Sequence, residues 1–446
     1  MKIDTGTTAW MIAATALVLL MTPGLAFFYG GMTRAKSVLN MMMMSFVSII
    51  TVTMAWVLYG HAFAFGTNGN DTLNKVIGGV KEVGLQSLID TATKADGSGM
   101  PSLVFSAFQL TFAIITVALI SGAVADRTKF GAWVIFSVAW ATLVYFPVAH
   151  WVWGGGWLTQ WGVEDFAGGT VVHVNAGAAG LALAFVLGKR KGWPKEPMRP
   201  HNLGYTLLGV GLLWFGWFGF NAGSELAVDG TAALAFMNTQ IATAAAAGAW
   251  IIVEKLRDKH STSLGVASGA VAGLVAITPA CGFIDPWAAV VLGALAGAIC
   301  AYAVGLKYKL NYDDSLDVVG VHLVGGLIGA VSLGILSRYP VADTKQGQGV
   351  LYGDHSLRQL GLQALAPVVI GLYSFLMAWI IGKIIDKTIG FRVSEDDEVA
   401  GIDIAVHAES AYDLAPGHSG SGTLAAVTAA SASAAEAKAT KVEADA

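Results

Sequence analysis

Eleven runs of apolar residues constrain this chain of 446 residues to a membrane protein. Each run holds about 20 residues, the length that an α-helix needs to cross the hydrocarbon core of a bilayer. Charged residues make up only 13% of the chain, against roughly 25% in an ordinary soluble domain. We therefore predict an all-α polytopic membrane protein with eleven transmembrane helices, centred near residues 18, 52, 115, 138, 179, 212, 245, 272, 295, 326 and 372.

Lysine and arginine gather in alternate connecting segments. They are frequent in 34–36, 127–129, 189–199, 255–259 and 307–309, and absent from 150–165, 223–230 and 281–286. Because positive loops stay in the cytosol, this pattern predicts an N-terminus outside and a C-terminus inside a cytoplasmic (inner) membrane. An odd number of spans agrees with that orientation.

The first apolar run could be mistaken for a signal peptide. It continues to Tyr29, however, and then stops at Arg34 and Lys36. A longer apolar stretch followed by positive charge is typical of a retained transmembrane helix.

The basic loop at 189–199 divides the runs into two sets of five, and one run remains. Two repeats with an odd number of spans must have opposite orientations, which is the inverted-repeat plan of many transporters. We predict a transmembrane domain at 1–389, with an inverted five-helix repeat at about 7–189 and 200–338 and a final helix at about 358–387. A cytosolic tail at 390–416 and a disordered Ala/Ser/Thr-rich extension at 417–446 follow.

A histidine lies in the last run of each repeat. His173 and His322 are each followed by glycine at the fourth and seventh positions, namely Gly177, Gly180, Gly326 and Gly329. An ionisable side chain at membrane depth normally faces a partner or a transport path. The match predicts one polar pair at the interface of the repeats. The alternative is two unrelated histidines, each bonded to a nearby carbonyl.

Polar groups also occur at the outer ends of the runs. Asp165 precedes His173 by eight residues, where a carboxylate can cap free N–H groups and favour nearby cations. Capping is the simpler of these two roles. Ser224 follows a stretch rich in Trp and Phe, and an aromatic face with a hydroxyl oxygen suits a small cation. An interfacial aromatic belt is the alternative explanation for many of these rings.

Several classes of function are disfavoured. The net charge of −4 gives no basic surface for nucleic acid. Cys281 and Cys300 lack metal-ligand spacing, and no nucleotide-binding, hydrolase or metalloprotease motif is present. A metalloenzyme using His173, His322 and Asp165 would lack a further ligand nearby in sequence. We therefore expect no catalytic residues, no cofactor and no metal.

Three motifs resemble those of the ammonium transporter family (Amt/Mep, with the Rh proteins as distant relatives), and specifically its Amt branch. They are DFAGG at 165–169 with His173, WFGFNAGS at 217–224, and the segment 317–326. The resemblance extends from Pro23 to about residue 414. It implies a homotrimer with one pore in each subunit, embedded in the lipid bilayer.

The resemblance also implies residue roles. Phe112, Trp153 and Ser224 match an outer ammonium site that Asp165 supports. The rings of Phe112 and Phe220 match a gate, and His173 and His322 match the twin histidines that line the pore and relay protons.

Together these features predict an ammonium transporter. Ammonium or methylammonium would bind outside and lose a proton, and the neutral amine would cross an apolar pore that makes any charged ion very costly. The proton would move separately if transport is electrogenic. The tail resembles a regulatory segment that a PII-type cytosolic protein engages. The alternative is an ammonium sensor that signals through this tail, although no catalytic domain is appended.

Overall fold

The computed structural model describes residues 3–90, 99–338, 347–352 and 357–412, and these residues form helices without a β-strand. The first predicted repeat comprises α1 (Thr5–Met32), η1 (Ala35–Ser37), α2 (Val38–Ala55), η2 (Trp56–Gly60), α3 (His61–Phe65), α4 (Asp71–Asn74), η3 (Val83–Leu85), α5 (Gln86–Asp90), α6 (Ser102–Ile120), η4 (Ser121–Val124), α7 (Phe130–Trp140), η5 (Ala141–Tyr145), α8 (Phe146–Val152), α9 (Trp157–Trp161), η6 (Gly169–Val174) and α10 (Asn175–Leu187).

The second predicted repeat comprises α11 (Leu203–Gly223), α12 (Gly230–Arg257), α13 (Ser263–Ile277), α14 (Pro286–Ala303), α15 (Leu306–Leu310), η7 (Val319–Leu323) and α16 (Val324–Leu336). The last long helix is α17 (Leu357–Thr388), and the tail adds α18 (Glu395–Ala400) and α19 (Ile402–His407). The predicted extension at 417–446, and residues 413–416 of the predicted tail, lie outside the described residues.

The long apolar helices are consistent with the sequence pattern. Ten helical segments among the described residues are long and apolar enough to cross a membrane, and α13 is a shorter apolar helix at the position of the eighth predicted span. Polar side chains mark where several of these helices begin, because they accept hydrogen bonds from free N–H groups of the first turn. The caps are Asp4 on α1, Asn202 on α11, Asp229 on α12 and Thr262 on α13.

The two predicted repeats meet along their first helices. A Cβ atom added to Gly209 of α11 would lie 2.2 Å from the backbone nitrogen of Phe28 in α1, and one added to Gly31 of α1 would lie 2.5 Å from that of Thr206. Glycine at these positions lets the two backbones approach closely, as in other transmembrane helix pairs.

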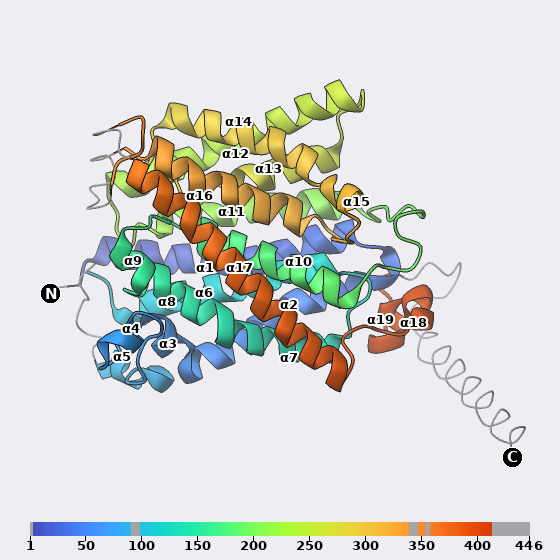
Figure 1. Cartoon of the computed structure of the whole chain (residues 1–446), viewed down its shortest axis with the longest axis horizontal. Helices are drawn as coiled ribbons and strands as arrows, with labels where there is room; N and C mark the ends of the chain where they lie inside the picture. Colours follow the sequence, from blue (N-terminus) through green and yellow to red (C-terminus); the bar gives the residue numbers. More distant parts are fainter. Residues whose placement is uncertain (1–2, 91–98, 339–346, 353–356, 413–446) are drawn as a thin grey trace, which may run out of the picture.

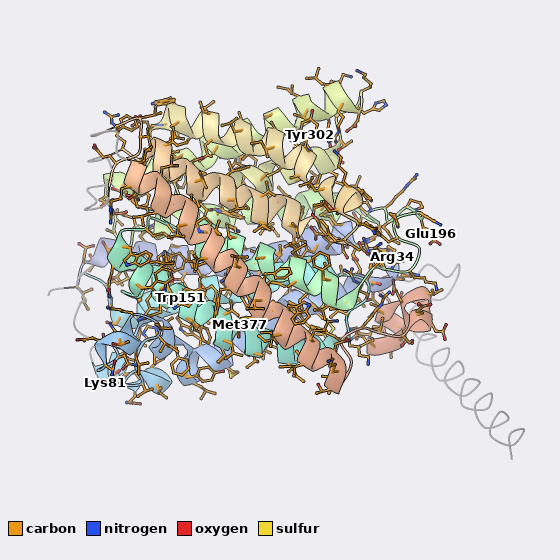
Figure 2. The ribbon with its side chains drawn as sticks, in the orientation of Figure 1. Arg34, Lys81, Trp151, Glu196, Tyr302 and Met377 are labelled. Atoms are coloured by element: carbon orange, nitrogen blue, oxygen red, sulfur yellow. The ribbon has the colours of Figure 1, made fainter. Side chains whose placement is uncertain are left out.

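The helices run along the long axis of the molecule, and α17 crosses them diagonally (Figure 1). The start of α1, α4, α5 and α9 lie at one end, and α18 and α19 lie at the other. Figure 2 places Arg34 and Glu196 at the tail end, Lys81 at the opposite end and Met377 of α17 between them. Charged residues therefore occupy the ends of the bundle, as a membrane-spanning arrangement requires.

Candidate transport site

An aromatic cavity of about 240 Å³ lies where α8 and α11 end, on the side that the positive loops predict to be outside. Its lining includes all three residues that the resemblance assigns to an outer site, namely Phe112, Trp153 and Ser224. The ring of Phe112 meets that of Trp153 edge to face, with 5.9 Å between centroids. The Ser224 hydroxyl donates to the Phe220 carbonyl at 2.8 Å, so its lone pairs stay available to accept from a ligand.

The sequence interpretation missed other residues of this cavity. Phe65, Phe105 and Gln109 also line it, and the Gln109 Oε1 is buried without a hydrogen-bond partner among the described residues. The spacing of Gln109, three residues before Phe112 on α6, places both on one helical face and was the available signal.

Asp165 holds the start of the fifth span. Its Oδ1 accepts from the N–H groups of Gly168 and Gly169 at 2.9 and 2.7 Å, and its Oδ2 accepts from Thr170 and Val171 at 2.9 and 3.0 Å. The Trp153 Nε1 donates to the Asp165 carbonyl at 2.8 Å. Four backbone donors therefore occupy the two oxygens of the carboxylate, as its capping role requires.

Two phenylalanine rings separate the outer cavity from the interior. Phe112 and Phe220 stack with 4.1 Å between centroids, and both are fully or almost fully buried. The Phe220 ring lies in turn 6.1 Å from that of His173. The stacked pair therefore lies between the aromatic cavity and the histidines.

The two predicted pore histidines meet directly. Their Nδ1 atoms lie 3.3 Å apart, so one ring donates to the other, and both side chains are buried. The sequence alternative of two unrelated, carbonyl-bonded histidines is therefore wrong. The Nε2 of His173 has no hydrogen-bond partner among the described residues, which leaves one polar atom for a passing molecule.

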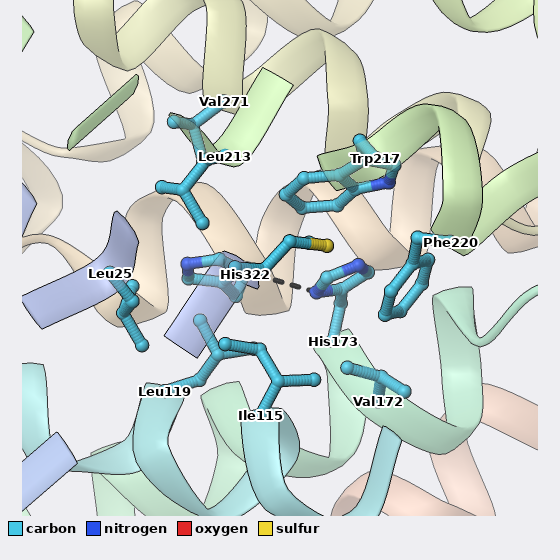
Figure 3. Close-up of a pocket in the computed structure, with 11 residues that line it drawn as sticks. Leu25, Ile115, Leu119, Val172, His173, Leu213, Trp217, Phe220, Val271 and His322 are labelled. Carbon is cyan, nitrogen blue, oxygen red and sulfur yellow. Dashed lines mark hydrogen bonds between the residues drawn. The ribbon is translucent and has the colours of Figure 1, made fainter. Parts of the chain in front are cut away.

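The histidines line a second cavity of about 10 Å³, whose other walls are apolar except for Trp217. This volume is about that of one water-sized probe. Figure 3 shows the two imidazoles joined across the cavity, with Phe220 beside His173 and with Leu25, Ile115 and Leu119 around them. The space suits a single small neutral molecule.

The paired glycines explain why the histidines meet. A Cβ on Gly177 would lie 2.5 Å from the backbone nitrogen of Leu323, directly after His322. A Cβ on Gly326 would lie 3.1 Å from the backbone nitrogen of Val174, directly after His173. Each repeat thus presses a glycine against the turn that carries the other histidine. Those turns, η6 and η7, are π-helical, a local widening of the helix that is common at functional sites.

Asp314, and not Asp317, caps the tenth span. Its Oδ1 accepts from Val318 N–H at 3.1 Å and its Oδ2 from Val319 N–H at 2.7 Å. The Asp317 carboxylate instead pairs with Lys307 at 2.6 Å, and the backbone of Asp317 is left-handed, with φ of 65°.

The tail as far as residue 412 packs on the other end of the bundle. The Asp403 carboxylate accepts from the N–H groups of Leu39 and Asn40 at 3.0 and 2.8 Å, and so it caps α2. Glu398 is fully buried and accepts from Lys191 N–H at 2.7 Å and from Arg392 at 2.6 Å. These contacts connect the tail to two of the basic loops. No group of His, Cys, Asp or Glu side chains that could hold a metal occurs within the described ranges.

Comparison with known proteins agrees with this arrangement. The model of the Ammonium Transporter Family matches residues 9–412. The ammonium transporter of Mycobacterium bovis is 52% identical over 92% of this chain and 91% of its own length, and that of Bacillus subtilis is 47% identical over 91% and 98%. The crystal structure of Saccharomyces cerevisiae Mep2 has a TM-score of 0.81 and 33% identity over 89% of each chain. The chain is therefore a multi-pass membrane protein that belongs to the ammonium transporter family, a family of transporters and not of enzymes.

Proposed function

We propose that this transporter binds ammonium in the outer cavity and conducts ammonia past the histidine pair. The supporting observation is the order of three features. The aromatic cavity of about 240 Å³ comes first, and the stacked rings of Phe112 and Phe220 follow. The apolar cavity of about 10 Å³, with its two hydrogen-bonded imidazoles, comes last. The Trp153 and Phe112 rings attract a cation by roughly 0.5–2 kcal/mol. The Ser224 oxygen accepts a hydrogen bond from one N–H group of the ammonium ion.

Selectivity follows from the second cavity. A charged ion that enters this cavity loses its hydration shell and contacts only imidazole nitrogens as polar partners. The free-energy cost of this desolvation is very high because the cavity is apolar. Ammonium escapes this cost by releasing a proton, whereas potassium has no proton to release. The Nε2 of His173, which has no partner among the described residues, then offers a hydrogen bond to the neutral molecule.

The proton either returns to the outside or follows through the histidine pair. Movement of one charge is coupled to the membrane potential by about 2.3 kcal/mol per 100 mV, which is enough to concentrate ammonium inside. The bonded Nδ1 atoms provide a relay between the two rings, and therefore we favour electrogenic uptake.

Current recording on proteoliposomes tests this mechanism. An inward ammonium gradient is expected to give a current that potassium does not give, and His173→Leu is expected to remove the current. Ammonia uptake without current would reject the electrogenic part. Ammonium binding with neither uptake nor current would instead support a sensor.

We also propose a cytoplasmic-membrane homotrimer whose tail receives a PII-type regulator. The exposed apolar side chains of Phe236 and Met237, which line a groove of about 440 Å³, support the trimer. The packing of the tail on the basic loops supports the regulator. Native mass spectrometry tests the trimer. Deletion from Gly390 onward is expected to change transport or regulator binding, whereas deletion from Gly417 is expected to change neither.

A further inference from the structure

The outer cavity is far larger than an ammonium ion needs. Its volume is about 240 Å³, against about 10 Å³ for the cavity beside the histidines. The smaller of these volumes holds one molecule of the size of water, and an ammonium ion is close to water in size. Ammonium alone therefore fills only a small part of the outer cavity, and the remaining space can hold an ion that carries several carbon atoms.

Most residues that line the outer cavity are aromatic, namely Phe65, Phe105, Phe112, Trp153 and Phe166. They come from α3, α6, the turn after α8 and the loop before η6, and so they reach the cavity from different elements. The rings of Phe65 and Phe105 lie 5.0 Å apart at 82°, and those of Phe112 and Trp153 lie 5.9 Å apart at 88°. Perpendicular ring walls of this kind are how proteins recognise quaternary ammonium ions, whose charge is spread over methyl groups.

Two polar side chains complete the wall. The Gln109 Oε1 is buried without a partner among the described residues, and the Ser224 hydroxyl donates to the Phe220 carbonyl, so that its oxygen is free to accept. A quaternary nitrogen has no N–H to offer these groups, whereas a hydroxyl on the same ion both donates and accepts. The Gln109 amide has a roughly two-fold terminal torsion, and therefore it can turn its oxygen towards such a hydroxyl. None of the described residues that line the cavity is a lysine, arginine or histidine, and a carboxylate on the ligand would stay unpaired.

We propose that the outer cavity also binds a hydroxylated quaternary ammonium ion, of which choline is the simplest example, as a blocker that is not transported. The rings hold the trimethylammonium group, and the hydroxyl bonds to Gln109. Such an ion has no N–H proton to release. The stacked rings of Phe112 and Phe220 lie between it and the histidines, and the cavity beside the histidines is too small for it. Competition with ammonium rests on the proposed function, whereas the binding of the ion does not.

Saturation-transfer nuclear magnetic resonance on the full chain in lipid nanodiscs tests the binding with choline as the probe. We expect a saturable choline signal that tetramethylammonium displaces. Two analogues of similar shape are the controls: the neutral alcohol in which carbon replaces the nitrogen of choline, and glycine betaine, in which a carboxylate replaces the alcohol. Neither is expected to displace choline. Absence of saturable binding, or displacement by either analogue as effective as that by choline, overturns the proposal, whether or not the protein transports ammonium.

Two variants assign the two halves of the ligand. Trp153→Leu is expected to weaken the binding of both choline and tetramethylammonium by roughly 2- to 30-fold, because one ring is lost. Gln109→Leu is expected to weaken choline binding by roughly 2- to 12-fold and to leave tetramethylammonium binding unaltered, since that ion has no hydroxyl. Gln240→Leu is the matched control, because Gln240 is exposed on α12 and does not line the cavity. Unaltered affinities in Trp153→Leu, or equal losses for both ions in Gln109→Leu, overturn the proposed mode of binding.

Uptake of methylammonium into proteoliposomes tests the blocking role. External choline at its own dissociation constant is expected to raise the KM for methylammonium about twofold without lowering kcat, as mass action requires. Labelled choline is expected to stay outside the vesicles. Entry of choline, or methylammonium uptake that choline leaves unchanged, overturns the blocking role. Saturable choline binding in a protein that transports no methylammonium would instead reject the proposed function and leave the binding site standing.

Discussion

The start of the fifth span, predicted to be outside, and the start of the tenth span, predicted to be inside, have similar backbone geometry. Their neighbouring side chains differ. Asp165 precedes His173, and Asp314 precedes His322, by eight residues, and each carboxylate accepts N–H groups of the π-helical turn that follows. The residue five positions before each histidine has a left-handed backbone: Gly168 with φ of 113° and Asp317 with φ of 65°.

The surroundings of these two turns are opposite in character. Above Asp165 lies the aromatic cavity, and the residue before it, Glu164, has neither carboxylate oxygen bonded within the described part of the chain. The residue before Asp314 is Asp313, which pairs with Arg190 at 2.8 Å and with Arg127 at 3.7 Å. The repeat therefore supplies the geometry that presents a histidine. The neighbours give the first turn an aromatic cavity and the second turn a set of ion pairs.

The largest expected effect on transport comes from replacing the cap Asp165, whereas replacing the cap Asp314 is expected to affect stability. Asp165→Ala frees four buried N–H groups at the outer site, each costing about 1–3 kcal/mol when left unpaired. We expect no methylammonium uptake above background in reconstituted protein, and partial uptake in Asp165→Asn, which keeps one accepting oxygen. Asp314→Ala is expected to lower stability without changing apparent affinity. Equal effects of Asp165→Ala and Asp314→Ala on affinity would show that the two turns are not functionally distinct.

The second prediction is that replacing either histidine has the same effect, because His173 and His322 share one hydrogen bond. Replacement of either His173 or His322 by Asp places a carboxylate in the apolar cavity, where a cation can neutralise it. We expect potassium currents in both variants and none in the wild type. Replacement of both by Leu with unchanged ammonium current and unchanged discrimination against potassium would reject a role for the pair.

The third prediction has a moderate effect. Trp153→Leu removes one cation-binding ring and the hydrogen bond to the Asp165 carbonyl, but it leaves the cap itself intact. We expect the concentration for half-maximal transport to rise by roughly 2- to 30-fold, as a loss of 0.5–2 kcal/mol requires. Unaltered concentration dependence and unaltered competition by methylammonium would place the cation elsewhere.

Hydropathy and spacing predicted much of this structure. The eleven apolar runs predicted the spans because burial in lipid demands continuous apolar helix. The glycines after His173 and His322 predicted the meeting of the two repeats, because only a missing Cβ permits that approach. The π-helical turns gave no sequence signal, since one extra residue in a turn leaves the hydropathy unchanged. Asp314 is one of three aspartates in 313–317, and only its separation of eight residues from His322 distinguished it in the sequence.

The last prediction compares Glu164 with Asp313, the residues that precede the two caps, and concerns the smallest effect on transport, since stability alone is expected to change. Burial raises the pKa of Glu164 from its ordinary 4.5 to about 7. Burial acts in the same direction on Asp313, but Arg127 and Arg190 outweigh it and hold the pKa of Asp313 below its ordinary 3.8. The folded state thus binds a proton on Glu164 more tightly than the unfolded state does. Its contribution to stability is present below about pH 4.5, falls as the pH rises towards 7, and is fully lost above it.

The Glu164→Gln variant keeps the shape and removes this titration. We expect it to raise the melting temperature of the detergent-solubilised protein above pH 7, where the ionised carboxylate costs on the order of 3 kcal/mol, and to leave it nearly unchanged near pH 4.5. Asp313→Asn is expected to lower the melting temperature above pH 7. It removes an anion that stabilises the fold at neutral pH through Arg127 and Arg190, a stabilisation that disappears only as the pH falls through the depressed pKa of Asp313. If both variants shift the melting temperature in the same direction above pH 7, then the unpaired acid at the outer turn and the paired acid at the inner turn do not differ in the way that their surroundings require.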